Sequence, residues 1–377
     1  MRIAYVSSSQ LPSRYANSIH VMKMCQALAD VGHDVLLTAT PGGEHAESDY
    51  EFYGVRPCFD IAKHCVPRFP PGYRGWRYAW KVAGAIKRWG PVDLICGRYL
   101  PGIAVAALRG TPCIVELHQP PVRSTRRIIN WLSRRGCLHK IVVITEALRN
   151  ACVEALVGVP PDRFIVCPDA ADEPSIDECP DVLLPFAKTS RLQIGYTGHL
   201  YPGKGMEILT RLAARLPSCD FHVVGGMPGD VASWQTVSVD IRNIHFHSFV
   251  APALVPAYQQ SMDILLAPYQ EQVLVSGGKD DVAPWMSPLK IFEYMSVGKP
   301  IIASDLPVLR EVLTDGENAL LAPSSDVAKW EAQVNRLRDP SLRNRLGSNA
   351  LREFRSQFTW QSRARRVLGM VDERKAA

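Results

Sequence analysis

Residues 287–304 read SPLKIFEYMSVGKPIIAS, and the order of residue types in this stretch decides the fold of the chain. Ser287 is a favourable helix N-cap and Pro288 a favourable first helical residue, so a helix is predicted to begin here. Gly298 predicts the end of that helix, and residues 300–304 predict a buried strand of the parallel type. A short helix leading into a buried strand is typical of an α/β protein.

The predicted helix start has the chemistry of an anion site. The N–H groups of Leu289 and Lys290 have no acceptor within the helix, so they would attract an anion such as phosphate. Glu293 lies nearly one turn further along, where its carboxylate can accept hydrogen bonds from hydroxyl groups. A phosphate next to a diol describes a nucleotide. The alternative is that Ser287 and Pro288 only cap a helix and that Glu293 faces solvent.

The stretch resembles the donor-site segment of the family 4 glycosyltransferases, which are retaining enzymes of the GT-B architecture. The resemblance implies two Rossmann-like, doubly wound α/β domains that face one another across a cleft. In that family two glutamates separated by seven residues flank the helix start. Glu293 matches the second glutamate, and Trp285 stands at the position of the first.

The composition is that of a soluble globular protein. The chain has 377 residues, of which 47% are hydrophobic and 21% charged, and this length accommodates two domains with separate cores. The first residues run directly into a strand and no apolar run approaches the ~20 residues of a membrane span, so we expect a cytoplasmic protein. The ten cysteines stand singly, which predicts neither a zinc site nor a disulfide framework.

The charge is unevenly distributed. Residues 1–170 contain 21 basic and 13 acidic residues, a net charge of +8, whereas residues 171–377 have a net charge of −2. A basic half indicates an acidic partner, such as nucleic acid, a phosphorylated acceptor or an anionic membrane surface. Of these, the predicted partners are a glycan or lipid-linked acceptor and an anionic membrane surface, and no nucleic acid is expected.

Residues 68–90 interleave cations with aromatic residues within the basic half. If the segment after Gly75 is helical, its tryptophans fall along one side with cations beside them, as in helices that lie on a membrane. The residues predicted to form this membrane or acceptor surface are Arg74, Trp76, Arg77, Trp80 and Lys81. The alternative is a helix that packs its tryptophans inward and keeps solvated cations outside.

The first half begins with a βαβ unit. The predicted elements are a strand at 3–7, a loop at 8–18, a helix from about 19 to 31 and a strand at 34–38. The loop follows the carboxyl end of the first strand, where open α/β sheets bind ligands. In the resembled family two glycines near the end of this loop touch the donor phosphates; Asn17 and Ser18 stand there, after Ala16. No G-x-G-x-x-G is present, which argues against a nicotinamide or flavin enzyme.

The remaining elements of the first half complete a sheet. Strands are predicted at 94–98, 112–118, 140–145 and 164–167, with a helix at 146–155. His118 ends one of these strands on the ligand side of the sheet. A lone histidine is more often structural than catalytic, but the resemblance implies that His118 lies at the donor sugar.

The second half contains a glycine-rich loop that is suited to phosphate. A strand at 192–196 leads through residues 197–205 into a helix from Met206, and a strand-to-helix loop of this kind can hold a phosphate. Relatives hold the diphosphate here with an arginine and a lysine. Lys204 matches the lysine, His199 stands at the arginine position, and Gly198 precedes it, so charge neutralisation would depend mainly on Lys204.

Further resemblances concern the nucleobase and the ends of the domains. A strand is predicted at 244–250, and by resemblance Phe249 and Val250 border the nucleobase. A third strand is predicted at 263–269, followed by a loop at 270–283. The predicted division is an N-terminal acceptor-side domain at 1–172, a linker at 173–190, a nucleotide-sugar-binding domain at 191–355 and a C-terminal helix at 356–377 that crosses back to the first domain.

The predicted function is that of a retaining glycosyltransferase that moves a sugar from a UDP- or GDP-linked donor to a hydroxyl of a glycan or lipid-linked acceptor. The candidate catalytic residues are His118, Lys204 and Glu293. No Asp-x-Asp triplet is present, so we expect no metal, and no cofactor beyond the donor itself. Two alternatives remain open: a non-catalytic subunit that binds nucleotide sugars, and a sugar-nucleotide epimerase on the same fold.

Overall fold

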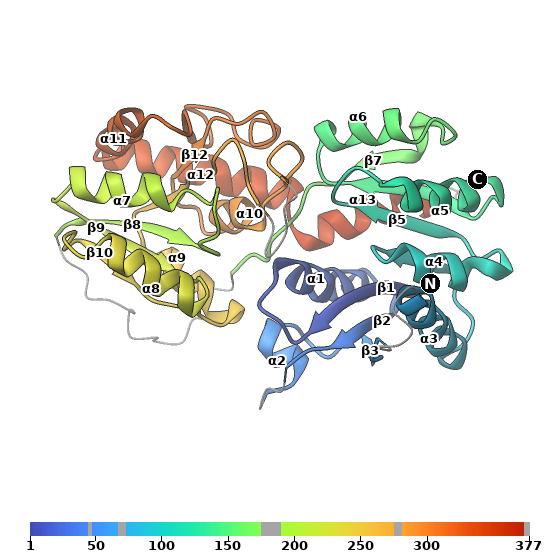
Figure 1. Cartoon of the computed structure of the whole chain (residues 1–377). Helices are drawn as coiled ribbons and strands as arrows, with labels where there is room; N and C mark the ends of the chain where they lie inside the picture. Colours follow the sequence, from blue (N-terminus) through green and yellow to red (C-terminus); the bar gives the residue numbers. More distant parts are fainter. Residues whose placement is uncertain (44–46, 67–72, 175–189, 275–280, 373–377) are drawn as a thin grey trace. The chain divides into compact units, whose positions relative to one another are not determined.

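The computed structural model describes residues 1–43, 47–66, 73–174, 190–274 and 281–372. The chain divides into two units (Figure 1). Unit 1 consists of Met1–Pro168 together with the chain from Trp360 onward, and unit 2 is Asp169–Thr359. Unit 2 therefore begins slightly before the expected linker. Residues 175–189 of that linker and residues 275–280 of the expected loop lie outside the described part of the chain.

Unit 1 is built on a seven-stranded parallel sheet with the order β3-β2-β1-β4-β5-β6-β7. The order reverses between β1 and β4, as in doubly wound folds. The strands are β1 (Arg2–Leu11), β2 (Asp34–Pro41), β3 (Asp60–Lys63), β4 (Leu94–Gly97), β5 (Cys113–Leu117), β6 (Leu138–Val143) and β7 (Phe164–Val166). The α-helices are α1 (Ala16–Asp30), α2 (Asp49–Tyr53), α3 (Arg74–Trp89), α4 (Leu100–Ala106), α5 (Arg123–Arg134), α6 (Glu146–Ala155) and α13 (Trp360–Asp372).

Helix α1 differs from its predicted bounds in a way that concerns the site. It begins at Ala16, after Tyr15 as N-cap, and not near residue 19. Strand β1 also continues to Leu11, where it still pairs with Pro41. Asn17 and Ser18 therefore lie in the first turn of a helix rather than in a loop.

Helix α3 settles which side of the basic, aromatic segment is buried. Tyr78, Ala79 and Val82 are buried, whereas Trp76 and Trp80 are 46% and 61% exposed. The alternative that the tryptophans pack inward is wrong, because the residues between them form the face that contacts the sheet. Residues 68–72 of the same segment lie outside the described residues.

Unit 2 is built on a six-stranded parallel sheet with the order β10-β9-β8-β11-β12-β13. Its order reverses between β8 and β11, so this unit is doubly wound as well. The strands are β8 (Leu192–Thr197), β9 (Cys219–Val224), β10 (Ile244–Phe246), β11 (Ile264–Ala267), β12 (Ile301–Ser304) and β13 (Leu320–Ala322). The α-helices are α7 (Met206–Arg215), α8 (Pro228–Val237), α9 (Val255–Ser261), α10 (Leu289–Ser296), α11 (Val327–Arg336) and α12 (Pro340–Gln357).

The core of unit 2 lies between the sheet and its helices. Ile264 and Ile302 from central strands, Phe221 from β9 and Trp330 from α11 belong to one buried cluster. Strand β11 is apolar along its length, as expected for a central strand of a parallel sheet that helices cover on both faces. The two doubly wound units confirm the predicted fold class.

Helix α13 follows unit 2 in sequence but belongs to unit 1, where it packs against α1. Arg363 on α13 is 2% exposed, and its Nε donates a hydrogen bond of 3.0 Å to the carbonyl oxygen of Pro168. Within the described residues, no helix has both the length and the apolar character that crossing a bilayer requires.

Candidate functional site

The loop between β8 and α7 lies at the carboxyl edge of the unit 2 sheet. Gly198 has φ +133°, and a Cβ at this position would lie 3.1 Å from Lys290 Nζ. Gly205 precedes α7 with φ +90°, and a Cβ there would lie only 1.8 Å from the carbonyl oxygen of Pro268. Glycine is required at both positions because of this geometry. The loop is thereby held against α10 on one side and the end of β11 on the other.

Two lysine side chains converge at this edge. The Nζ atoms of Lys204 and Lys290 each lie 5.1 Å from the ring centroid of Tyr269, and Lys290 Nζ lies 3.6 Å from that of Tyr196. Burial lowers the pKa of Lys204 to about 8. Burial, and then the charge of Lys204, hold the pKa of Lys290 well below its ordinary value, against the opposing effect of Glu293. The site thus contains two amines that share one desolvated region.

The start of α10 differs from the predicted cap. The helix begins at Leu289 with Pro288 as N-cap, and no side chain caps it. The prediction that Ser287 is the N-cap is wrong, because its Oγ instead accepts a hydrogen bond of 2.9 Å from the backbone N–H of Asp169. The N–H groups of Leu289 and Lys290 therefore keep the anion-attracting character of a helix start.

Glu293 lies one turn into α10 and is half-buried. Its Oε2 lies 3.4 Å from Nε2 of Gln259, a buried side chain on α9 that also donates a hydrogen bond of 3.1 Å to Thr197 Oγ1. This contact orients the carboxylate at the sheet edge, so the alternative that Glu293 faces bulk solvent does not hold. Gln259 was not predicted from the sequence, since nothing in the residues of α9 marks it as different from a surface glutamine.

His199 does not extend as an arginine would. Its ring stacks on that of Tyr201, with a centroid distance of 4.7 Å and an interplanar angle of 9°. Its carbonyl oxygen accepts a hydrogen bond of 2.5 Å from the hydroxyl of Tyr196. The side chain at the expected arginine position is therefore packed within its own loop.

The loops after β8, β9 and β10 touch one another. A Cβ at Gly225 would lie 2.4 Å from the carbonyl oxygen of Gly198, and Gly225 N donates a hydrogen bond of 2.7 Å to Ser248 O. Strand β10 ends at Phe246, earlier than predicted, so Phe249 and Val250 lie in the loop and are half-buried. These contacts bring the predicted nucleobase residues to the same edge as Gly198.

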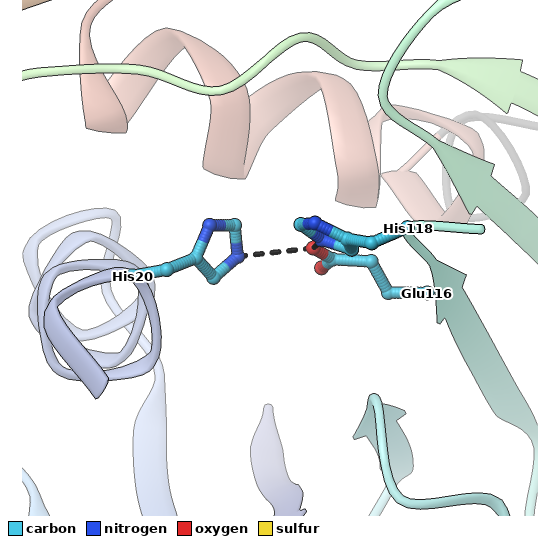
Figure 2. Close-up of side chains that lie close together, drawn as sticks. All are labelled: His20, Glu116 and His118. Atoms are coloured by element: carbon cyan, nitrogen blue, oxygen red, sulfur yellow. Dashed lines mark hydrogen bonds and ion pairs between the residues drawn. The ribbon is translucent and has the colours of Figure 1, made fainter. Parts of the chain in front are cut away.

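A second cluster lies in unit 1 and joins His20 of α1, Glu116 of β5 and His118, which follows β5 (Figure 2). Glu116 Oε1 lies 3.0 Å from His20 Nε2 and 2.6 Å from His118 Nε2. The rings of His20 and His118 meet edge to face with a centroid distance of 5.3 Å. Arg363 of α13 completes the cluster, with Nη2 at 3.1 Å from the same Glu116 oxygen.

The electrostatics of this cluster favour an ionised glutamate. Burial alone would raise the pKa of Glu116, but Arg363, His20 and the hydrogen bond from His118 outweigh it and hold that pKa well below its ordinary range. The ligand atoms of His20, Glu116 and His118 lie within 4.8 Å of one another, which is close enough to hold a metal ion. The guanidinium of Arg363 already neutralises the carboxylate, so the arrangement satisfies its charges without a metal.

Of the residues in this cluster, only His118 was predicted as a site residue from the sequence. Residues 116 and 118 lie on the same face of an extended segment, so the spacing of Glu116 and His118 was an available signal. His20 lies 96 positions before Glu116 in the sequence, and Arg363 is 247 positions away. No local pattern could have linked these residues.

The other predicted residues of unit 1 have different environments. Asn17 is exposed, whereas Ser18 is buried, and its Oγ donates a hydrogen bond of 2.9 Å to Gln10 O. Arg74, Arg77 and Lys81 are exposed on α3. The predicted site residues thus form two groups: His118, Asn17 and Ser18 belong to unit 1, and the residues around Lys204 and Glu293 belong to unit 2.

Comparison with known proteins gives matches along most of the chain. A family model described as "Glycosyltransferase Family 4" matches residues 18–173, and one described as "Glycosyl transferases group 1" matches residues 191–339. Each model covers most of one unit.

Three similar proteins illustrate the range of the matches. The phosphatidyl-myo-inositol mannosyltransferase of Mycolicibacterium smegmatis is 24% identical over 341 residues, 86% of this chain and 81% of the relative. The D-inositol 3-phosphate glycosyltransferase of Acidothermus cellulolyticus is 27% identical over 265 residues, 65% of this chain and 55% of the relative, so the match spans about half of that protein. The structure of Anabaena HepE in complex with UDP superposes with a TM-score of 0.73 at 16% identity, covering 99% of this chain and 100% of that one, and it shares the fold.

Proposed function

The chain belongs to the family 4, group 1 glycosyltransferases, and from that premise we propose that it moves a sugar from a nucleoside diphosphate to a hydroxyl of a glycan or lipid-linked acceptor. The donor is of the UDP or GDP type. The anomeric configuration of the sugar is retained.

The edge of the unit 2 sheet carries this proposal. Lys204 and the uncapped start of α10 offer positive charge, and Glu293 offers a carboxylate one turn away. A diphosphate fits the first pair and the diol of a ribose fits the second. As the bond to the sugar breaks, negative charge develops on the diphosphate, and the same groups stabilise it.

The reaction is proposed to need no metal ion. Lys204 and the helix start supply the electrostatic stabilisation that a divalent cation supplies in metal-dependent transferases. Because the carboxylate of Glu293 at this edge is assigned to the ribose, the departing phosphate is proposed to accept the proton of the acceptor. His118 is assigned to the donor sugar, and Glu116 orients its ring.

The acceptor is proposed to be lipid-linked and presented at an anionic membrane. Two relatives act on inositol-containing acceptors by name, and one of these names a phosphatidyl lipid. On α3, Trp76 and Trp80 are exposed beside Arg74, Arg77 and Lys81. Interfacial tryptophans next to cations are typical of helices that bind membrane surfaces, since the two groups contribute apolar and electrostatic attraction together.

The activity test uses a panel of nucleotide sugars with and without acceptor. The expected result is release of one nucleoside diphosphate that depends on the acceptor and is matched by a glycosylated product. Binding of a donor without release or conversion would instead identify a non-catalytic subunit, and conversion of the donor sugar without an acceptor would identify an epimerase.

The membrane test is sedimentation with vesicles of rising anionic lipid content. Binding is expected at low salt, and it should weaken but persist as salt rises, because salt does not screen the contribution of Trp76 and Trp80. Changing Arg74, Arg77 and Lys81 together to Glu should abolish it. The matched control changes three exposed cations of unit 2 to Glu, namely Lys329, Arg336 and Arg352. Equal binding by both triple variants would refute the α3 surface.

A further inference from the structure

The side chain of Lys290 is buried in an unusual state. It is only 9% exposed, and its Nζ has no hydrogen-bond partner within the described residues. A buried amine without a hydrogen-bond acceptor opposes folding, because the ring of Tyr196 replaces only part of the hydration that the amine has lost. A methionine or leucine would fill the same space without this penalty. The amine is therefore kept for something other than packing.

Two tyrosine rings and a second amine surround Nζ of Lys290. Tyr196 of β8 presents its ring face at 3.6 Å, and Tyr269 after β11 lies further away at 5.1 Å. Lys204 approaches the same Tyr269 ring from the loop before α7, and its positive charge disfavours a positive charge on Lys290. Glu293 on α10 attracts Lys290, but no ion pair joins the two residues in the part of the chain that the structure describes. The region thus brings two amines together near the carboxylate of Glu293.

The Lys290 side chain is expected to lead toward the N-terminal end of α10. Lys290 is the second residue of α10, and side chains of a helix lead back toward its N-terminus. Nζ lies beside the Gly198 loop, 3.1 Å from where a Cβ at position 198 would stand. The amine, the N–H groups of Leu289 and Lys290, and the Gly198 loop therefore meet at one place.

We propose that Lys290 is the second cationic ligand of the donor diphosphate and that it supplies the charge which His199 does not. The inference rests on the proposed function, because it takes the carboxyl edge of unit 2 as the donor site. It replaces the expectation that Lys204 carries the diphosphate charge almost alone. His199 stacks on Tyr201 within its own loop, and Lys290 approaches the same loop from α10. The second charge thus comes from a different element.

The test measures binding of UDP, GDP, their nucleosides and inorganic pyrophosphate to the purified full chain by calorimetry. The variants are Lys290→Met, Lys204→Met and, as a matched control, Lys329→Met, which removes an exposed lysine of the same unit. Lys290→Met is expected to weaken binding of the preferred nucleoside diphosphate and of pyrophosphate about tenfold to a hundredfold. Binding of the nucleoside should not change, and Lys329→Met should match the wild type.

Stability without ligand separates a binding role from a structural one. Since the amine opposes folding, Lys290→Met is expected to melt at or above the wild-type temperature, and to lose most of the upward shift that pyrophosphate causes. Lys290→Gln serves as a second variant that keeps a polar end without charge, and it should behave in the same way.

Three results would overturn the assignment. The first is a Lys290→Met variant that binds nucleoside diphosphate as tightly as the wild type while Lys204→Met does not. The second is an equal loss of nucleoside and diphosphate binding. The third is unfolding of both Lys290 variants, because the amine must be dispensable for the fold. Failure of the wild type to bind any of the nucleotides or pyrophosphate would instead refute the donor site itself, which is a separate outcome.

Discussion

Replacing Glu116 by glutamine keeps the shape of the side chain but removes the charge that the unit 1 cluster shares. Glu116 is 5% exposed and faces three donors through one oxygen: His20 at 3.0 Å, His118 at 2.6 Å and Arg363 at 3.1 Å. Breaking a buried ion pair from one side costs about 3–5 kcal/mol, since the other charge stays buried without compensation. Unit 1 has roughly 190 residues, for which each kcal/mol shifts the melting temperature by about 2–4 °C. The expected loss is therefore about 6–20 °C.

The assay measures the thermal unfolding of the full chain at neutral pH by scanning calorimetry. The control variant is Glu154→Gln on the exposed side of α6, which should melt with the wild type. Adding Arg363→Met to Glu116→Gln should recover part of the loss, because the second change removes the stranded guanidinium. A Glu116→Gln melting temperature within 2 °C of the wild type would refute the cluster as a source of stability.

The pH dependence of the same variant provides an independent check. The folded-state pKa of Glu116 is held well below its ordinary value of 4.5 by Arg363, His20 and His118, against the effect of burial. A lowered carboxyl pKa adds stability above the unfolded pKa, and that stability is lost as the pH falls from about 4.5 toward the folded pKa. The difference in the free energy of unfolding between wild type and Glu116→Gln should therefore become smaller as the pH falls below about 4.5. A difference that is constant from pH 7 to pH 3 would contradict the proposed charge state.

Three further predictions concern the reaction. Glu293→Gln should weaken donor binding by about 1.5–3 kcal/mol, the value of a charge-assisted hydrogen bond; an unchanged affinity in a donor titration would rule out the ribose contact. Burial lowers the pKa of Lys204 to about 8, so the affinity for nucleoside diphosphate should fall between pH 7 and pH 9 in the wild type and in His199→Ala. The affinity should fall less steeply in Lys204→Met. An affinity that does not change with pH in His199→Ala would assign the positive charge on the diphosphate to the histidine. Initial rates should be equal with and without a chelator, and activity that is lost to the chelator and restored by Mg²⁺ or Mn²⁺ would refute the metal-independent mechanism.

Much of the fold was predictable because its strands and helices have strong local patterns. The helix predicted at 146–155 has these same bounds in α6, and Thr145 caps it through the backbone N–H of Leu148 at 3.1 Å. The cap predicted at Ser287 failed although its local pattern was equally good. Its hydroxyl contacts Asp169, which lies 118 positions away. Such a tertiary contact overrides the preference of serine for the N-cap, and the sequence around Ser287 does not indicate it.

The candidate site also contains residues that local sequence predicts and residues that only tertiary packing brings there. Lys204 and Glu293 were predicted from the sequence and lie at the edge where a donor is expected, since a glycine-rich loop and a helix start are local features. Lys290 was predicted only as part of the helix start. Its side chain is buried against Tyr196 and Tyr269. This burial depends on how β8, β11 and α10 pack together, and no short stretch of sequence predicts that packing. Arg363 is an extreme case, because its partner Glu116 lies in another part of the sequence.

The division of unit 1 into two segments has a consequence for biosynthesis. The ribosome makes Met1–Pro168 first, then all of unit 2, and only then helix α13. At about 5–20 residues per second, Arg363, which lies 247 positions after Glu116, is synthesised roughly 12–50 s later than Glu116. Unit 2 is contiguous and can complete its own sheet during that interval, so the part of the protein that is translated later is expected to fold first. A nascent chain stalled before Trp360 should therefore present a protease-resistant unit 2 attached to a protease-sensitive unit 1.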